Sequence, residues 1–223
     1  MAVEVSAAVM STKMSLNLHG DQASISGHGA MGELGIKLVD PGRISVRYSV
    51  ITPLSIHGDL IPTDSMVINE TDFGKKQTQG QQSQSDQKPV SVDVTMGTSQ
   101  KIEFTCLRLG KGNFWLNPAF VGQWVNIGVT ATGEKDGKQV SDTETFRSFL
   151  YGAGAEAVYD YGYSRCHATV VASDKYLFGR FAYQWAISNN LDCEFGYEAE
   201  QMKLERESIA RTQAIYGRIV WGW

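Results

Sequence analysis

The chain has 223 residues, of which 42% are hydrophobic and 20% are charged, and its formal net charge is -4. This length allows a sizeable hydrophobic core without help from disulfides or metals. The composition excludes an intrinsically disordered chain, and the net negative charge removes the usual electrostatic argument for a nucleic-acid binder.

Alternation of apolar and polar residues is the dominant local pattern in the first part of the chain. It predicts half-buried β-strands, because successive side chains of a strand point to opposite faces. Turn-forming residues such as Asp40-Pro41-Gly42 separate the runs. We expect a mainly β domain over residues 1–172, an antiparallel sandwich or barrel, with strands around Met14–Leu18, Leu34–Leu38, Arg43–Ile51, Val90–Met96, Ile102–Cys106 and Val125–Ala131.

A polar segment, KKQTQGQQSQSDQK, occupies residues 75–88 and contains no apolar residue. Such a segment adds nothing to a core and is typical of a long exposed loop. It is interpreted as a solvated hairpin tip or, as the alternative, a loop that becomes ordered against a partner. Lys75 and Lys76, its adjacent basic pair, are candidate partner-binding residues.

In the last fifty residues the apolar side chains recur every three to four positions instead of every two, and this spacing predicts one or two C-terminal helices within residues 173–223. After the potential N-cap pair Ser173-Asp174, Leu177, Phe181 and Trp185 recur every four residues. A second stripe follows at helical spacing: Phe195, Ala199, Met202, Ile209 and Tyr216. The chain then ends in an alternating strand or extended tail, and we expect an α+β protein in which this region packs on the same core.

Motifs for catalysis or cofactor binding are weak. Gly27–Gly32 matches GxGxxG, but only a short, strand-like segment follows it, so nucleotide binding is not predicted. Cys166-His167 and Cys193 lack the second closely spaced pair of a zinc site, and neighbouring residues of a strand point to opposite faces. The three scattered cysteines suggest free, buried thiols, with a Cys166–Cys193 disulfide as the alternative. We expect no enzyme and no cofactor.

One short pattern, L-x-[LI]-H-G-D, occurs twice and contains His19, Asp21, His57 and Asp59. His-Gly-Asp is suited to a turn after a strand, because glycine and aspartate favour turn conformations. The alternative is a metal or acid–base cluster, if the two segments are neighbours in space. The turn is the preferred interpretation, and no metal site is predicted.

Paired aromatic residues next to glycine are the candidate contact surface. Tyr159, Tyr161 and Tyr163 lie in YDYGY, and Trp221 and Trp223 end the chain in WGW. Such rings offer large amphipathic faces to a partner. The terminal segment also has the pattern of a strand that adds to the sheet of another subunit.

The absence of a recognisable membrane-spanning or export segment favours a cytoplasmic or virion protein that does not contact a membrane. No window approaches 18 consecutive apolar residues, and Glu4 stands where a signal peptide requires basic residues.

Two short segments resemble a known family. TPLSIHGD at Thr52–Asp59 and AIYGRIVWG at Ala214–Gly222 are similar to segments of the RNA-binding backbone subunits of CRISPR effector complexes. The resemblance implies an RNA-binding subunit. The chain departs from that family before the first segment and in a predicted charged helix that replaces a glycine-rich loop, so no functional residue is transferred.

The preferred function is a non-enzymatic structural or assembly subunit, a virion or phage structural protein that associates with copies of itself or with a protein partner. The first alternative is the CRISPR-type RNA-binding backbone subunit. A carbohydrate-binding module is the second alternative, and an enzyme that uses the two His-Gly-Asp segments is the third.

Overall fold

The computed structural model describes residues 2–18, 23–40, 44–61, 91–106, 109–135, 138–204 and 208–223. These residues form twelve antiparallel strands. They contain no helix, and hence none that is long and apolar enough to span a membrane. The strands are β1 (Ala2–Leu18), β2 (Ala23–Asp40), β3 (Ile44–Ile61), β4 (Ser91–Met96), β5 (Ser99–Cys106), β6 (Leu109–Lys111), β7 (Phe114–Lys135), β8 (Lys138–Asp160), β9 (Ser164–Ala172), β10 (Tyr176–Ser188), β11 (Leu191–Lys203) and β12 (Ile209–Gly222).

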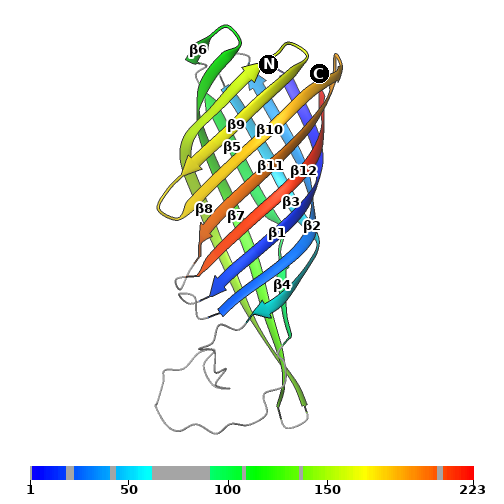
Figure 1. Cartoon of the computed structure of the whole chain (residues 1–223), viewed down its shortest axis with the longest axis vertical. Coiled ribbons are helices and arrows are strands. Elements are labelled where there is room, and N and C mark those ends of the chain that lie inside the picture. The colour runs from blue at the N-terminus through cyan, green and yellow to red at the C-terminus, as the bar shows by residue number, and fades with distance from the viewer. Residues whose placement is uncertain are drawn as a thin grey trace.

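The sheet closes on itself as a barrel of ten strand positions (Figure 1). The order β7-β5-β3-β2-β1-β12-β11-β10-β9-β8 returns to β7, because β7 pairs with both β5 and β8. β4 and β5 occupy one position, since both pair with β7 along successive stretches. The N- and C-termini lie at the same end of the barrel, here called the terminus end; β7 and β8 extend furthest toward the opposite, loop end (Figure 1).

The predicted barrel is confirmed, and the predicted C-terminal helices are wrong. Leu177, Phe181 and Trp185 lie in strand β10. A spacing of four residues is also a multiple of the strand period of two, so these side chains share one face of a strand as readily as one face of a helix. Ser173 marks a turn and not a helix N-terminus: its Oγ accepts hydrogen bonds from the amides of Lys175 (3.3 Å) and Tyr176 (3.1 Å).

The terminal strand β12 is paired on both edges, with β1 and with β11. Its pairing with β1 reaches the last residue, since the amide of Trp223 donates to the carbonyl of Val3 (3.1 Å). The predicted addition of this segment to the sheet of another subunit is therefore wrong, because both rows of its backbone groups are used within the chain.

The second His-Gly-Asp segment is not a turn. His57, Gly58 and Asp59 continue strand β3, where His57 lies opposite His28 of β2. His19 and Asp21 lie outside the described residues, as do Lys75, Lys76 and the whole polar segment 75–88.

Candidate functional site

Large apolar side chains cover the outside of the barrel. On β2, Leu34 is 68% exposed, and on β12 Ile215 is 67% exposed. Side chains of this kind recur around the barrel: Val5, Val9, Ile36, Leu38, Ile44, Tyr48, Phe114, Leu116, Phe120, Trp124, Phe149, Tyr151, Tyr159, Val170, Leu177, Phe181, Tyr183, Phe195, Tyr197, Ile219 and Trp221. We call this surface the apolar band. The sequence predicted that the apolar face of each strand would be buried, and in this part of the barrel that prediction is wrong.

The apolar face changes sides along several of the strands. On β1, Val5 and Val9 point outward near the terminus end, whereas Met10 and Met14 farther along are buried and Lys13 is exposed. A pair of adjacent apolar residues marks the change, because one belongs to each face. The same signal is present in several other strands, at Val50-Ile51, Trp124-Val125, Phe149-Leu150, Leu177-Phe178 and Ala214-Ile215. These pairs could have located the apolar band from the sequence.

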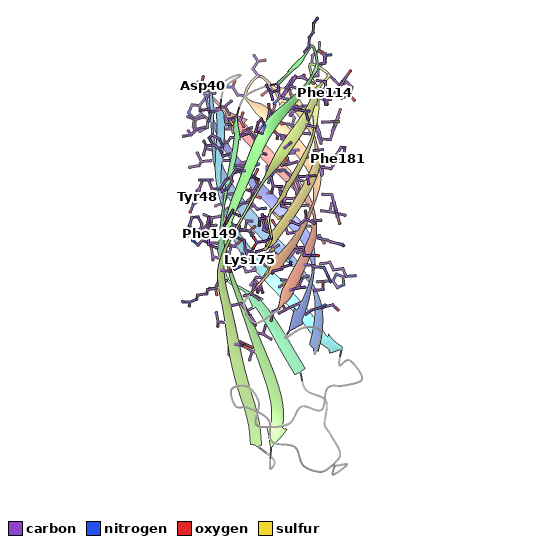
Figure 2. The ribbon with its side chains drawn as sticks, turned by 90° about the vertical axis from the view of Figure 1, so that its left-hand side faces the viewer. Asp40, Tyr48, Phe114, Phe149, Lys175 and Phe181 are labelled. Atoms are coloured by element: carbon purple, nitrogen blue, oxygen red, sulfur yellow. The ribbon has the colours of Figure 1, made fainter. Side chains whose placement is uncertain are left out.

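The apolar band is about ten residues tall along the strands, the length that a tilted strand needs to cross a bilayer. It covers residues 114–124 on β7 and 149–159 on β8. Phe114 lies at the terminus end, Phe181 near mid-height, and Tyr48 and Phe149 toward the loop end (Figure 2). Aromatic rings are thus present at both edges of the band, as at the two interfaces of transmembrane barrels.

Inside the same part of the barrel, the side chains are charged and paired. Arg218 of β12, 2% exposed, bonds Glu33 of β2 (2.9 Å) and also Glu194 of β11. Glu33 in turn pairs with Arg47 of β3 (3.3 Å). Glu194 accepts a hydrogen bond from the Tyr216 hydroxyl (2.8 Å) and lies 3.2 Å from Nε2 of His167. Each buried charge in this cluster is compensated by an opposite one, as burial requires.

A second group of ion pairs crosses the lumen. Lys101 of β5 reaches Glu200 of β11 (2.7 Å), although four strand positions separate β5 from β11 in either direction around the barrel. Arg180 of β10 bonds Glu103 of β5 (2.5 Å) and Glu198 (3.4 Å). Together with the Arg218 cluster, these pairs form a charged layer that spans the lumen.

Toward the loop end, the lumen is filled by an apolar layer. Its buried members include Met10, Met14, Leu16, Met31, Ile51, Met96, Ile127, Phe146, Leu150 and Met202. The exposed positions of β1 and β12 at this level are polar, among them Lys13, Arg211 and Gln213. This part of the barrel therefore has the polarity of a barrel in water, whereas the part nearer the termini has the reverse polarity.

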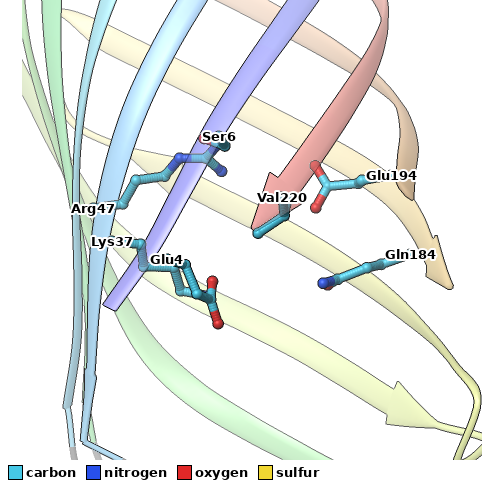
Figure 3. A pocket seen from close by; sticks show the side chains of 7 residues that line it. All are labelled: Glu4, Ser6, Lys37, Arg47, Gln184, Glu194 and Val220. Atoms are coloured by element: carbon cyan, nitrogen blue, oxygen red, sulfur yellow. The ribbon is translucent and has the colours of Figure 1, made fainter. Parts of the chain in front are cut away.

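A small polar hollow of about 20 Å³, room for about one water molecule, lies beside the charged layer, and Figure 3 shows the side chains that line it. Arg47 points from β3 toward Ser6 on β1 and donates to its Oγ (2.9 Å) (Figure 3). Glu4 and Lys37, which also line the hollow, form an ion pair (3.4 Å). The hollow is lined by both signs of charge, and it does not favour a ligand of either sign.

The aromatic residues predicted as a contact surface lie at the terminus end. Tyr159, Tyr161, Tyr163, Trp221 and Trp223 are all exposed. The rings of Tyr159 and Tyr161 lie 4.5 Å apart, and the Ala186 amide bonds the carbonyl of Tyr163 (2.9 Å). The structure thus places these five side chains outside the barrel, near the edge of the apolar band.

The cysteine and metal predictions have separate outcomes. Cys106, Cys166 and Cys193 are free, as expected, but they are partly exposed and not buried. His167 is buried in the lumen, whereas Cys166, its neighbour in β9, is on the opposite face. Among the described residues, no group of three His, Cys, Asp or Glu side chains is arranged to hold a metal ion.

No protein-family model and no curated protein matches the sequence. Among solved structures, the chain is similar to the outer membrane protease OmpT from Escherichia coli, with a TM-score of 0.47 and 8% identity over 100% of this chain and 97% of that one. It is also similar to Ail, the attachment invasion locus protein of Yersinia pestis (TM-score 0.42, 10% identity, 99% of this chain and 100% of that one). Neisserial surface protein A gives a TM-score of 0.40 and 10% identity, over 99% and 98% of the two chains.

These findings overturn several predictions. The similar structures are outer membrane β-barrel proteins, not virion proteins, CRISPR subunits or carbohydrate-binding modules, so the predicted self-assembling structural subunit is wrong, and so are the CRISPR-type and carbohydrate-binding alternatives. The expected cytoplasmic or virion location without membrane contact is wrong as well. The search for long apolar windows detects only helices, whereas a strand crosses a bilayer with about ten alternating residues.

Proposed function

We propose that this chain is a transmembrane β-barrel of the outer-membrane type whose lumen is sealed, and that it acts as a membrane anchor or scaffold rather than as a pore. The apolar band is the observation that carries the proposal. Soluble monomers rarely expose contiguous apolar patches larger than a few hundred Å². A closed barrel leaves no unpaired sheet edge in lipid, and the band has the height of a hydrocarbon core.

The orientation follows from the two ends of the barrel. At the terminus end, the connections 41–43, 161–163 and 189–190 are short, whereas at the loop end residues 62–90 separate β3 from β4. Outer-membrane barrels have short periplasmic turns and longer extracellular loops. We therefore assign the terminus end to the periplasmic side and the polar loop end to the outside. Tyr159, Tyr161, Tyr163, Trp221 and Trp223 then form the periplasmic aromatic girdle and contact lipid headgroups.

Insertion is tested with the full chain, refolded from urea into phosphatidylcholine vesicles with or without bromine on the acyl chains. Trp124, Trp221 and Trp223 are more than half exposed on the outside, whereas Trp115 is buried. Because bromine quenches indole fluorescence at short range, brominated lipid is expected to remove most of the tryptophan emission. A folded chain that stays in aqueous solution, with emission unchanged by brominated vesicles, would refute the proposal.

A sealed lumen predicts that the inserted protein conducts no ions. In planar bilayers, the inserted protein is expected to show no conductance steps, because the charged layer and the apolar layer close the lumen in series. A chain with alanine at Lys101 and Arg180 is expected to remain silent, since the apolar layer that includes Ile127 and Leu150 is intact. Adding Ile127→Ala and Leu150→Ala to that variant is expected to produce conductance. Pore-sized steps from the unmodified protein would show that the lumen is open.

We also propose, as the sequence indicated, that the chain is not an enzyme. The charged side chains of the lumen are committed to one another, with Arg180 on Glu103 and Lys101 on Glu200. Groups held in this way stabilise the closed lumen.

A further inference from the structure

A groove on the outside of the barrel lies at the loop-end edge of the apolar band. It has a volume of about 360 Å³ and lies between the start of β5 and the adjacent parts of β7 and β8. Trp124 and Phe149 form its apolar wall, with ring centroids 4.4 Å apart. Gln100, Asn126 and Arg147 supply its polar side. The groove therefore combines an aromatic surface with a cationic group at the level where the band ends.

A local irregularity in the sheet shapes the groove. Met96 of β4 is opposite Ile127, but Gln100 of β5 is opposite Trp124, so one extra residue is inserted between the two stretches. Such a bulge bends the strand and redirects nearby side chains. At the bulge, the Gly97 amide bonds the Asn126 carbonyl (2.7 Å), and a Cβ at Gly97 would come within 2.7 Å of the Asn126 side-chain nitrogen. The glycine thus allows Asn126 to pack against the bulge.

The aromatic wall continues up the band. Phe149 lies 6.2 Å from Tyr151, and Tyr151 lies 6.3 Å from Phe120, measured between ring centroids. Gly122 leaves room beneath Phe149, whose ring carbons would be 3.2 Å from a Cβ at that position. An acyl chain that lies along these aromatic rings would bring its polar end to the level of Arg147.

Arg147 is available to an anion. It is exposed, lies opposite Asn126, and forms no ion pair or hydrogen bond among the described residues. Exposed charged residues elsewhere on the described surface are also mostly basic. In the described part of the chain, Asp40 and Asp174 are the exposed acidic residues, against Lys13, Lys111, Arg147, Arg165, Lys175, Lys203 and Arg211. Among the described residues, carboxylates such as those of Glu33, Glu103 and Glu194 are buried in the lumen and do not reach the outer surface.

We propose that this groove is a binding site for an anionic phospholipid of the loop-end leaflet. The lipid phosphate binds Arg147, with Gln100 and Asn126 as amide donors, and an acyl chain lies along Trp124, Phe149 and Tyr151. The planar guanidinium suits a phosphate because it can donate two parallel hydrogen bonds. This inference rests on the proposed membrane-spanning function, since the acyl chain must be held beside the apolar band.

The test uses the full chain in a neutral detergent, titrated with dioleoyl phosphatidic acid, and counts bound lipid by native mass spectrometry. We expect one lipid bound more tightly than the rest. Arg147→Gln is expected to weaken that site about tenfold to a hundredfold, the loss for one hydrogen bond between charged groups. Trp124→Leu tests the apolar wall and should weaken the same site. Arg211→Gln, which removes another exposed basic residue of the loop end, is the matched control and should leave it unchanged.

Several outcomes would overturn the site. Equal binding by the unmodified chain and by Arg147→Gln would do so, and so would equal losses in Arg147→Gln and Arg211→Gln, because the attraction would then be a diffuse property of the basic surface. Equal affinity for dioleoyl phosphatidylcholine would show that the phosphate charge has no role. A chain that enters vesicles but lacks a selective lipid site contradicts only this inference, whereas a chain that stays in water contradicts the proposed function itself.

Discussion

Arg218→Met is expected to lower the free energy of unfolding by about 3–5 kcal/mol, the cost of removing one partner from a buried ion pair. Arg218 is the shared partner of Glu33 and Glu194, and its replacement by an uncharged side chain of similar length leaves both carboxylates partly uncompensated. Glu33 would retain Arg47, and Glu194 would retain His167, which limits the loss. Urea titration of the protein in phospholipid vesicles, followed by tryptophan fluorescence, measures the change.

Two variants separate charge from packing. Lys37→Met removes one member of a partly exposed ion pair with Glu4, where side-chain exposures are 34% and 28%, and should cost less than about 1 kcal/mol. The double variant Arg218→Met, Glu194→Gln keeps the Glu33–Arg47 pair and removes the uncompensated carboxylate, so it should recover much of the lost stability. Similar losses in Lys37→Met and Arg218→Met would contradict the assignment of the buried cluster as the stabilising one.

Leu34→Arg is expected to cost about 2–4 kcal/mol in a bilayer, the penalty for arginine at the lipid-facing midplane of a barrel. Leu34 is the most exposed large apolar residue of β2 and lies between Ala7 of β1 and Val50 of β3. In water the same substitution would be nearly neutral, because the side chain is already 68% exposed. The sign and size of the effect therefore report the solvent around the barrel.

Gln213→Arg is the matched control for this prediction. Gln213 is exposed on β12 and lies opposite Lys13, outside the apolar band. Arginine there should change the free energy of unfolding by no more than about 0.5 kcal/mol. If Leu34→Arg and Gln213→Arg behaved alike in vesicles, the band would not be in contact with hydrocarbon. Urea unfolding of both variants and the parent chain, in the same vesicles, provides the comparison.

Much of the strand content was predictable. Alternation identified parts of β1, β2, β3, β4, β5 and β7, and it favoured a barrel or sandwich. The helices predicted after residue 173 failed for a specific reason: Leu177, Phe181 and Trp185 satisfy both a helical and a strand period. Strand pairing resolves that ambiguity, because each residue from Leu177 to Ala186 has a partner on β11.

The amino-acid pattern settled that the strands have one apolar and one polar face, and that no long apolar helix is encoded. It did not settle which face points inward, because alternation is symmetric: a strand in water buries its apolar face, and a strand in lipid exposes it. Closure of the barrel fixed that choice, since it brought Lys101 to Glu200 and Arg180 to Glu103 across the lumen from strands that are far apart in the sheet. Leu34 and Ile215 were left on the outside, where no protein core covers them.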